Sequence, residues 1–138
     1  MTNRESGEKL IKEAERIFAR DLKAAIEDKD HNLAIRRAQE VVELLLKGAL
    51  KVLGVDYPKV HDVGEVFVRK VKEKYPSVDE VMLERIKAIS MWLGEARVPS
   101  FYFERDYNEE DAQRAFEDAD FMVKDVKRVF NLQGTWGK

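Results

Sequence analysis

The segment from Asn32 to Leu53 limits the fold more than any other part of this chain, because apolar residues occupy most of its positions. Its polar residues fall into one narrow stripe, made of Arg36, Glu40, Glu43, Lys47 and Lys51. Their spacings of three and four residues place them along one face of an α-helix. A helix with so wide an apolar surface must contact neighbours on most of its sides. We therefore expect a helical bundle with this segment as its central helix.

The same periodic placement of apolar residues predicts further helices on both sides of the central one, and no segment has the pattern of a β-strand. The predicted helices cover residues 6–27, 32–53, 62–75, 77–98 and 108–130. Gly54 suits the left-handed position that ends a helix, and Pro99 should stop the fourth helix. The predicted capping pairs are Asp62 with Glu65, Ser77 with Glu80 and Asn108 with Asp111.

These elements predict an all-α fold, an up-and-down four-helix bundle with one additional short helix. The chain of 138 residues should form a single domain over residues 1–138, with a frayed tail at 131–138. Residues 99–107, with the sequence PSFYFERDY, connect the last two helices. Because this connection is rich in aromatic residues, we expect it to pack against the bundle.

The composition excludes several classes of protein and site. The chain has no cysteine, which removes disulfides, thiolate metal sites and a cysteine nucleophile. Its first residues are charged throughout, and no apolar run is long enough for a membrane span, so we expect a cytoplasmic protein without a membrane partner. The net charge of −2 gives no overall basic field for nucleic acid, and the 38% of charged residues favours a thermophilic source.

The motifs of common catalytic and metal sites are absent from the sequence. It has no glycine-rich phosphate loop, no Gly-x-Ser-x-Gly turn and no His-x-x-x-His pair. A di-metal bundle needs Glu-x-x-His on two helices, and the nearest match is the single pair of Asp28 and His31 in a predicted loop. The sequence therefore predicts no metal site and no cofactor.

Two pairs of polar residues near the central helix can carry chemistry. His61 can act as an acid or a base with Asp62 orienting it, or Asp62 can cap the next helix while His61 packs over the helix start. Lys47 and Glu43 can line a cleft or a dimer contact, or they can form a solvent-exposed face. The sequence leaves these alternatives open.

A third group surrounds Arg97 near the predicted end of the fourth helix. Its neighbours in the sequence include four aromatic residues, Phe101, Tyr102, Phe103 and Tyr107. A guanidinium group among aromatic rings is a combination that binds phosphates and stacks on bases. The same residues can equally form a hydrophobic plug between two helices.

Taken in order, these segments resemble the HEPN domain family, which is named for nucleotide binding in higher eukaryotes and prokaryotes. The matching segments are DLKAAIE, AQEVVELLLKGALKVLG, HDVGE, AR followed by SFYFE, and YNEEDAQRAFEDA, which together span almost the whole chain. The resemblance to small, stand-alone prokaryotic members implies a four-helix bundle that forms homodimers. It also implies a nucleotide or RNA ligand and a small nucleotidyltransferase as partner.

Many ribonucleases of this family use an Arg that is followed, a few residues later, by a His. Arg97 matches the Arg, but after the residues VPSF the His position holds Tyr102. A Tyr with a pKa of about 10 is a poor acid–base catalyst near neutral pH, where His with about 6.5 works well. The candidates for phosphate binding are Arg97, Tyr102, Lys47, His61 and Asp62, and the candidates for catalysis are Arg97, Tyr102 and His61.

The sequence thus favours a non-catalytic protein that binds the phosphate of a nucleotide or nucleic acid and pairs with a nucleotidyltransferase. One alternative is a metal-free ribonuclease toxin of a toxin–antitoxin pair, in which Tyr102 or His61 replaces the missing His. Another is a plain protein-interaction module, in which the charged stripe and the aromatic segment form only an interface.

Overall fold

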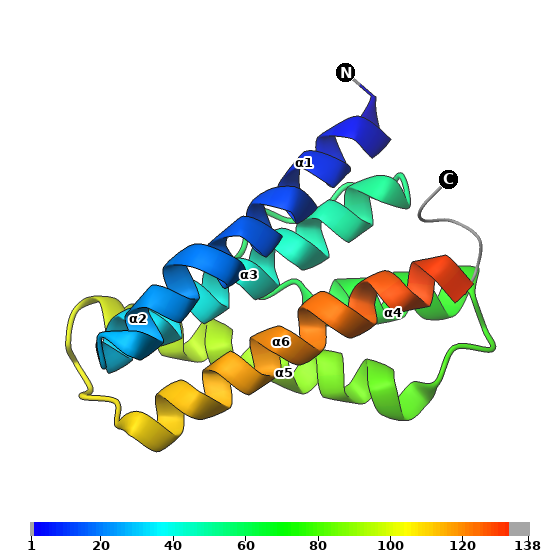
Figure 1. Ribbon diagram of the computed structural model, residues 1–138. Helices are drawn as coiled ribbons and strands as arrows, with labels where there is room; N and C mark the ends of the chain where they lie inside the picture. Colours follow the sequence, from blue (N-terminus) through cyan, green and yellow to red (C-terminus); the bar gives the residue numbers. More distant parts are fainter. Residues whose placement is uncertain (1, 133–138) are drawn as a thin grey trace.

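The computed structural model describes residues 2–132, which form helices joined by short connections (Figure 1). The elements are α1 (Asn3–Arg16), the π-helical segment η1 (Ile17–Leu22), α2 (Lys23–Glu27), α3 (His31–Val52), α4 (Gly64–Lys74), α5 (Glu80–Phe101) and α6 (Glu109–Leu132). Because α1, η1 and α2 follow one another without a break, they form one long first helix. Together with α3, α5 and α6 it makes the predicted four-helix bundle, and α4 is the additional short helix.

The predicted boundaries hold to within a few residues, except at the C-terminal end. The predicted frayed tail began at residue 131, but α6 continues through Leu132. Residues 133–138 of that tail lie outside the described residues. Among the helices of residues 2–132, none is both long and apolar enough to cross a membrane.

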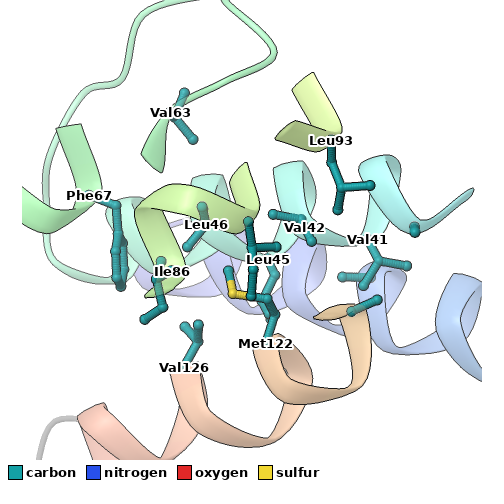
Figure 2. Close-up of a cluster of buried hydrophobic side chains, with 14 of the residues drawn as sticks. Val41, Val42, Leu45, Leu46, Val63, Phe67, Ile86, Leu93, Met122 and Val126 are labelled. Carbon is teal, nitrogen blue, oxygen red and sulfur yellow. The ribbon is translucent and has the colours of Figure 1, made fainter. Parts of the chain in front are cut away.

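α3 is the centre of the bundle, as its wide apolar surface predicted. It contacts the long first helix, α5 and α6, and none of its residues is fully exposed. Four α3 residues meet side chains of α4, α5 and α6 in one buried cluster (Figure 2). The cluster includes Val41, Val42, Leu45 and Leu46 of α3, Phe67 of α4, Ile86 and Leu93 of α5, and Met122 and Val126 of α6.

The long first helix contains a π-helical turn that the periodic pattern did not predict. In such a turn each N–H bonds to the carbonyl five residues earlier, so the turn accommodates an extra residue. The turn covers Ile17–Leu22, and Leu22 at its end is fully buried. The helix also begins earlier than predicted, because the hydroxyl oxygen of Thr2 accepts a hydrogen bond from the N–H of Glu5 at 3.0 Å and caps it.

The predicted end of α3 and the predicted start of α6 are confirmed. Gly54 has a φ of 75°, and the N–H of Val55 donates to the carbonyl of Leu50 at 2.9 Å, which is the Schellman arrangement. At the start of α6, Asn108 and Asp111 exchange side-chain to backbone hydrogen bonds of 2.9 and 3.0 Å. These bonds make the reciprocal capping box that the spacing indicated.

The other two predicted capping boxes are wrong. α4 begins at Gly64, and Asp62 accepts hydrogen bonds from the N–H of Gly64 at 3.1 Å and from the hydroxyl of Ser90 at 2.6 Å. α5 begins at Glu80, where Asp79 rather than Ser77 is the cap. At α4 the tertiary contact of Asp62 with Ser90 takes the place of the predicted capping box, and at α5 the cap lies two residues later than predicted.

Pro99 does not stop α5, which continues to Phe101. A proline costs one helical hydrogen bond, here the one to the carbonyl of Glu95, and this loss falls in the last turn of the helix. The hydroxyl of Ser100 donates to the carbonyl of Arg97 at 2.9 Å, and the N–H of Tyr102 donates to the carbonyl of Val98 at 3.0 Å. These two bonds close the turn in spite of the proline.

The connection between α5 and α6 is held by its backbone instead of by its aromatic rings. Asn32, a buried residue of α3, donates to the carbonyls of Ser100 and Arg105 and accepts from the N–H of Tyr107, at 3.1, 3.0 and 2.9 Å. Phe103, by contrast, is 67% exposed. The expectation that the aromatic segment packs down is therefore wrong for the rings at its centre.

Gly7 of α1 and Gly48 of α3 let the two helices touch backbone to backbone. A Cβ atom on Gly48 would lie 2.7 Å from the carbonyl oxygen of Gly7 and 2.7 Å from Cγ1 of Ile11. Both distances are shorter than atoms in a packed core tolerate, so this crossing requires glycine.

We predict that Gly48→Ala lowers the free energy of unfolding by about 1–3 kcal/mol, because the added methyl forces α1 and α3 apart. Helix propensity alone gives the opposite sign, since Ala is preferred to Gly by about 1 kcal/mol in a helix. Urea unfolding measures the change, and Ala88→Gly on the exposed face of α5 measures the propensity effect by itself. A Gly48→Ala protein as stable as wild type contradicts the close crossing.

Candidate functional site

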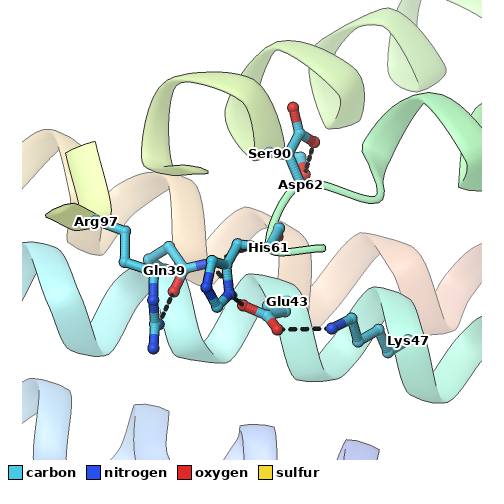
Figure 3. A network of polar contacts seen from close by, with 7 residues as sticks. All are labelled: Gln39, Glu43, Lys47, His61, Asp62, Ser90 and Arg97. Carbon is cyan, nitrogen blue, oxygen red and sulfur yellow. Dashed lines mark hydrogen bonds and ion pairs between the residues drawn. The ribbon is translucent and has the colours of Figure 1, made fainter. Parts of the chain in front are cut away.

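Four of the five predicted phosphate-binding residues lie on one face of the bundle, around the middle of α3. Arg97 comes from α5, Lys47 from α3, and His61 and Asp62 from the segment that leads into α4 (Figure 3). Asp62 faces Ser90, and the other three are joined through two residues of α3, Gln39 and Glu43. The sequence placed these residues far apart, and α3 brings them together.

Arg97 is fixed by a neutral partner. Its Nη1 donates to Oε1 of Gln39 at 2.5 Å, and Gln39 is only 2% exposed. Among the residues that the structure describes, no carboxylate pairs with this guanidinium, although eleven other Lys or Arg side chains in the same part of the chain pair with Asp or Glu. A half-buried guanidinium that keeps its charge and most of its N–H donors is suited to bind an anion.

Glu43 is the hub of the network. It accepts hydrogen bonds from Lys47 at 2.7 Å and from Gln39 at 2.9 Å, and its Oε1 lies 2.9 Å from Nδ1 of His61. Burial alone would raise the pKa of Glu43, but the bonds from Lys47, Gln39 and His61 outweigh burial and hold this pKa below its ordinary value. Glu43 is therefore a carboxylate at neutral pH.

His61 and Asp62 do not act as a pair. His61 turns to Glu43 and keeps 56% of its side chain exposed, whereas Asp62 turns to Ser90 and to the N–H of Gly64. The backbone at Gly64 approaches α5 closely, since a Cβ atom on Gly64 would lie 2.6 Å from Cβ of Ser90. Asp62 thus fixes the segment before α4 against α5, while Glu43 orients His61.

Lys47 lies inside the network instead of on a solvent-exposed face. Its side chain is 14% exposed, and its Nζ lies 5.3 Å from the centre of the Tyr57 ring as well as next to Glu43. The segment after the helix thus covers two residues of the polar stripe, Glu43 through His61 and Lys47 through Tyr57. Of the two alternatives that the sequence left open, the solvent-exposed face is wrong for Lys47 and Glu43.

Tyr102 does not join the network. Its ring is 67% exposed and meets Phe101 edge to face, with 4.8 Å between the ring centres. Arg36 of α3 lies over the other ring, with its Cζ 4.4 Å from the centre of Phe101. The aromatic residues therefore form a separate surface at the end of α5, next to Arg97 in the sequence.

The sequence analysis missed Gln39 and Ser90 as site residues. Gln39 is a buried amide that touches Arg97, Glu43 and the carbonyl of His61. One signal was available, because Gln39 precedes Glu43 by four residues and so shares its helical face. No such signal pointed to Ser90, whose partner Asp62 lies 28 residues away.

The described residues contain no group of three or more His, Cys, Asp and Glu side chains placed to hold a metal ion. The groups that face one another are two cations, one carboxylate, one imidazole and one amide, from Arg97, Lys47, Glu43, His61 and Gln39 respectively. Such a set can bind an anionic group at Arg97, with Gln39 and Glu43 fixing the geometry around it.

Comparison with known proteins assigns this arrangement to a family. No curated protein and no solved structure matches the chain significantly. The family model of the HEPN domain matches residues 4–129 of the sequence, which cover both the whole bundle core and the network around Arg97. The chain therefore belongs to the HEPN domain family, as the resemblance predicted.

Proposed function

We propose that this protein is a non-catalytic HEPN protein that binds the phosphate of a nucleotide or nucleic acid at Arg97. The observation that carries the proposal is the guanidinium of Arg97, fixed by the buried amide of Gln39 and free of any carboxylate partner among residues 2–132. A guanidinium presents a rigid fork of N–H donors that matches the oxygens of a phosphate. HEPN membership supports a ligand related to nucleotides or RNA.

The burial of Gln39 is best explained by its role in placing Arg97. A buried side-chain amide must satisfy its donors and its acceptor, and an apolar residue would fill this position of α3 at lower cost. Gln39 uses its oxygen for Arg97 and its nitrogen for Glu43, so it fixes the cation relative to the hub of the network.

The absence of catalysis is proposed from Tyr102. This residue stands where the resemblance expects a histidine, and its ring is exposed and bonded to no other member of the network. A phenol holds its proton near neutral pH, so it accepts a proton poorly in RNA cleavage. Arg97 on its own can bind a phosphate but cannot move a proton.

We also propose that the protein acts as a homodimer and pairs with a small nucleotidyltransferase, which the resemblance described in the sequence analysis implies. Support comes from Met91 and Val98 of α5, which are 49% and 51% exposed and lie seven residues apart on one helix face. Met and aromatic residues are enriched where protein surfaces meet. Such a face beside Arg97 suits either a second copy or the partner enzyme.

A second candidate function is a metal-free ribonuclease, and one observation favours it. Nδ1 of His61 lies 2.9 Å from Oε1 of Glu43, which leaves Nε2 free while a carboxylate orients the ring. An oriented imidazole near a cationic phosphate contact has the composition of an acid–base site. In this alternative Tyr102 still stands at the family's histidine position, and His61, from another part of the chain, takes over the role of that histidine.

Arg97→Ala should abolish the stabilisation that AMP, ATP or a short RNA gives to the wild-type protein. A ligand at about 100 times its Kd adds about 2.7 kcal/mol, which thermal unfolding detects as a shift of a few degrees. Gln39→Leu should weaken the same binding about tenfold, because it releases the guanidinium. Arg85→Ala is the matched control, since Arg85 also lies on α5 but stacks on Phe121. A shift that survives in Arg97→Ala places the ligand elsewhere.

We expect the wild-type protein to leave a fluorescently labelled RNA intact at high protein concentration. The ribonuclease alternative instead predicts cleavage that falls by about 100-fold or more in His61→Ala, the usual size of an acid–base effect. Tyr102→Phe separates the two candidate groups, because it removes the phenol and keeps the ring. Cleavage lost in both His61→Ala and Arg97→Ala overturns the non-catalytic assignment.

Glu43→Gln should destabilise the protein at pH 7 and have less effect in acid. The pKa of Glu43 is lower in the folded protein than its ordinary value of 4.5, so the folded state binds fewer protons between the two values and gains stability as pH rises. The contribution is complete above pH 4.5 and is lost as pH falls through the folded pKa. Urea unfolding of both proteins at pH 7 and below pH 4 measures it, with Glu84→Gln as the exposed control. An equal difference at both pH values contradicts the lowered pKa.

A further inference from the structure

Three consecutive aromatic residues lie exposed where α5 ends. Phe101, Tyr102 and Phe103 are 50%, 67% and 67% exposed, and they lead into the connection to α6 (Figure 1, yellow). Single apolar residues are ordinary on a protein surface, but three consecutive exposed aromatic residues, which we call the aromatic patch, are not, and Phe101 and Tyr102 contact each other edge to face. The packing of this chain alone does not account for the patch, because Asn32 holds the connection through its backbone.

Phe103 occupies a position that suits glycine. Its φ is 55°, and the N–H of Glu104 donates to the carbonyl of Pro99 at 3.0 Å. α5 therefore ends in the same Schellman arrangement as α3, where the left-handed position is filled by Gly54. A bulky residue with such a φ is strained. The end of α2 has the same arrangement with Lys29 at a φ of 56°, so the feature particular to Phe103 is its exposed aromatic ring.

Three arginines of this region have no carboxylate partner in the described part of the chain, and Arg97 precedes Phe101 by four residues on the same face of α5. Arg36 lies over the ring of Phe101 at 4.4 Å, Arg105 lies over Tyr107 at 4.8 Å, and Arg97 is bonded to Gln39. The carboxylates nearest in sequence, Glu104 and Asp106, are exposed. The patch therefore combines aromatic faces with cations that no internal charge neutralises directly.

We propose that Phe101, Tyr102 and Phe103 form a stacking platform for the unpaired bases of a single-stranded nucleic acid, whose phosphates contact Arg97 and Arg36. This inference rests on the proposed phosphate site at Arg97 and specifies its ligand. Every base has a face that stacks on an aromatic ring, and arginines beside the rings bind the backbone of the strand. A duplex hides its base faces, and a mononucleotide can use only one ring.

The identity of the side chains favours a nucleic acid over a second copy of this chain on the platform. A protein interface requires apolar area, which Leu or Ile supplies without the cost of an aromatic residue at a left-handed position. Stacking on bases requires flat rings, and the unpaired arginines require an anion. Phe103→Leu therefore separates the two occupants, because it keeps apolar area and removes the ring.

The test is fluorescence anisotropy with a labelled twelve-nucleotide oligo(A) RNA, the same sequence in DNA, and each strand in duplex form. Phe103→Gly and Phe103→Leu should both weaken binding of the single strand by about 5- to 100-fold, the usual effect of losing one stacked base. Phe103→Trp should retain binding, and Val81→Gly, at the other end of α5, is the exposed control. Glu104→Gln should strengthen binding, because it removes a negative charge beside the strand.

Thermal unfolding of each variant shows whether weaker binding comes from the loss of the binding site or from unfolding of the protein. Phe103→Gly should unfold at the same temperature as wild type or at a higher one, since glycine relieves the strained φ. If Phe103→Leu binds the single strand as wild type does, or if duplex binds as tightly as single strand, the platform is wrong. If Arg97→Ala leaves binding unchanged while Phe103→Gly weakens it, the phosphate site fails and the platform stands. If the protein binds the RNA and the DNA strand with equal affinity, its ligand class is single-stranded nucleic acid in general.

Discussion

The polar side chains that Gln39 and Glu43 of α3 present to their neighbours constrain where the other elements lie. α3 is apolar enough to be covered on all sides, yet around its middle it carries Gln39 and Glu43, which are 2% and 15% exposed. Buried polar groups are stable only when each finds partners. Those partners come from the end of α5 and from the segment before α4, so the same bonds that satisfy α3 also fix the position of both segments around Arg97.

The two connections at this face are held by buried polar contacts of the same kind. Asn32 binds the backbone of the α5–α6 connection, and Asp62 binds Ser90 and Gly64 where the chain enters α4. Neither connection needs its exposed side chains for its own conformation. Tyr102 and Phe103 therefore keep their rings exposed on a fixed backbone, and Glu43 orients His61 while more than half of its side chain stays exposed, which is the preorganisation that a binding site requires.

The sequence predicted the parts of the fold that depend on local spacing. The 3.6-residue periodicity found each helix of the bundle, and the wide apolar surface of α3 identified its central place. Gly54 and Asn108 were predicted because their partners lie within a few residues. Local spacing could not determine the role of Asp62, because its partner Ser90 lies 28 residues away. The continuation of α5 past Pro99 was missed because the proline falls in the last turn, where one lost hydrogen bond costs little. The site followed the same division: Arg97 was predicted from its aromatic neighbours and from family resemblance, whereas Gln39 was not, because its role requires α5 beside α3.

The two helix ends of α3 and α5 show how stability and function compete in this chain. Both helices end in a Schellman arrangement, and only the end of α3 uses the glycine that this backbone prefers. Packing within the described part of the chain gives little reason for Phe at the other end, because its side chain is 67% exposed. Residues that are strained, apolar and exposed lower stability in three ways at once. The proposed platform gives these residues a role, because a ligand that covers the rings offsets the cost of their exposure at the end of α5.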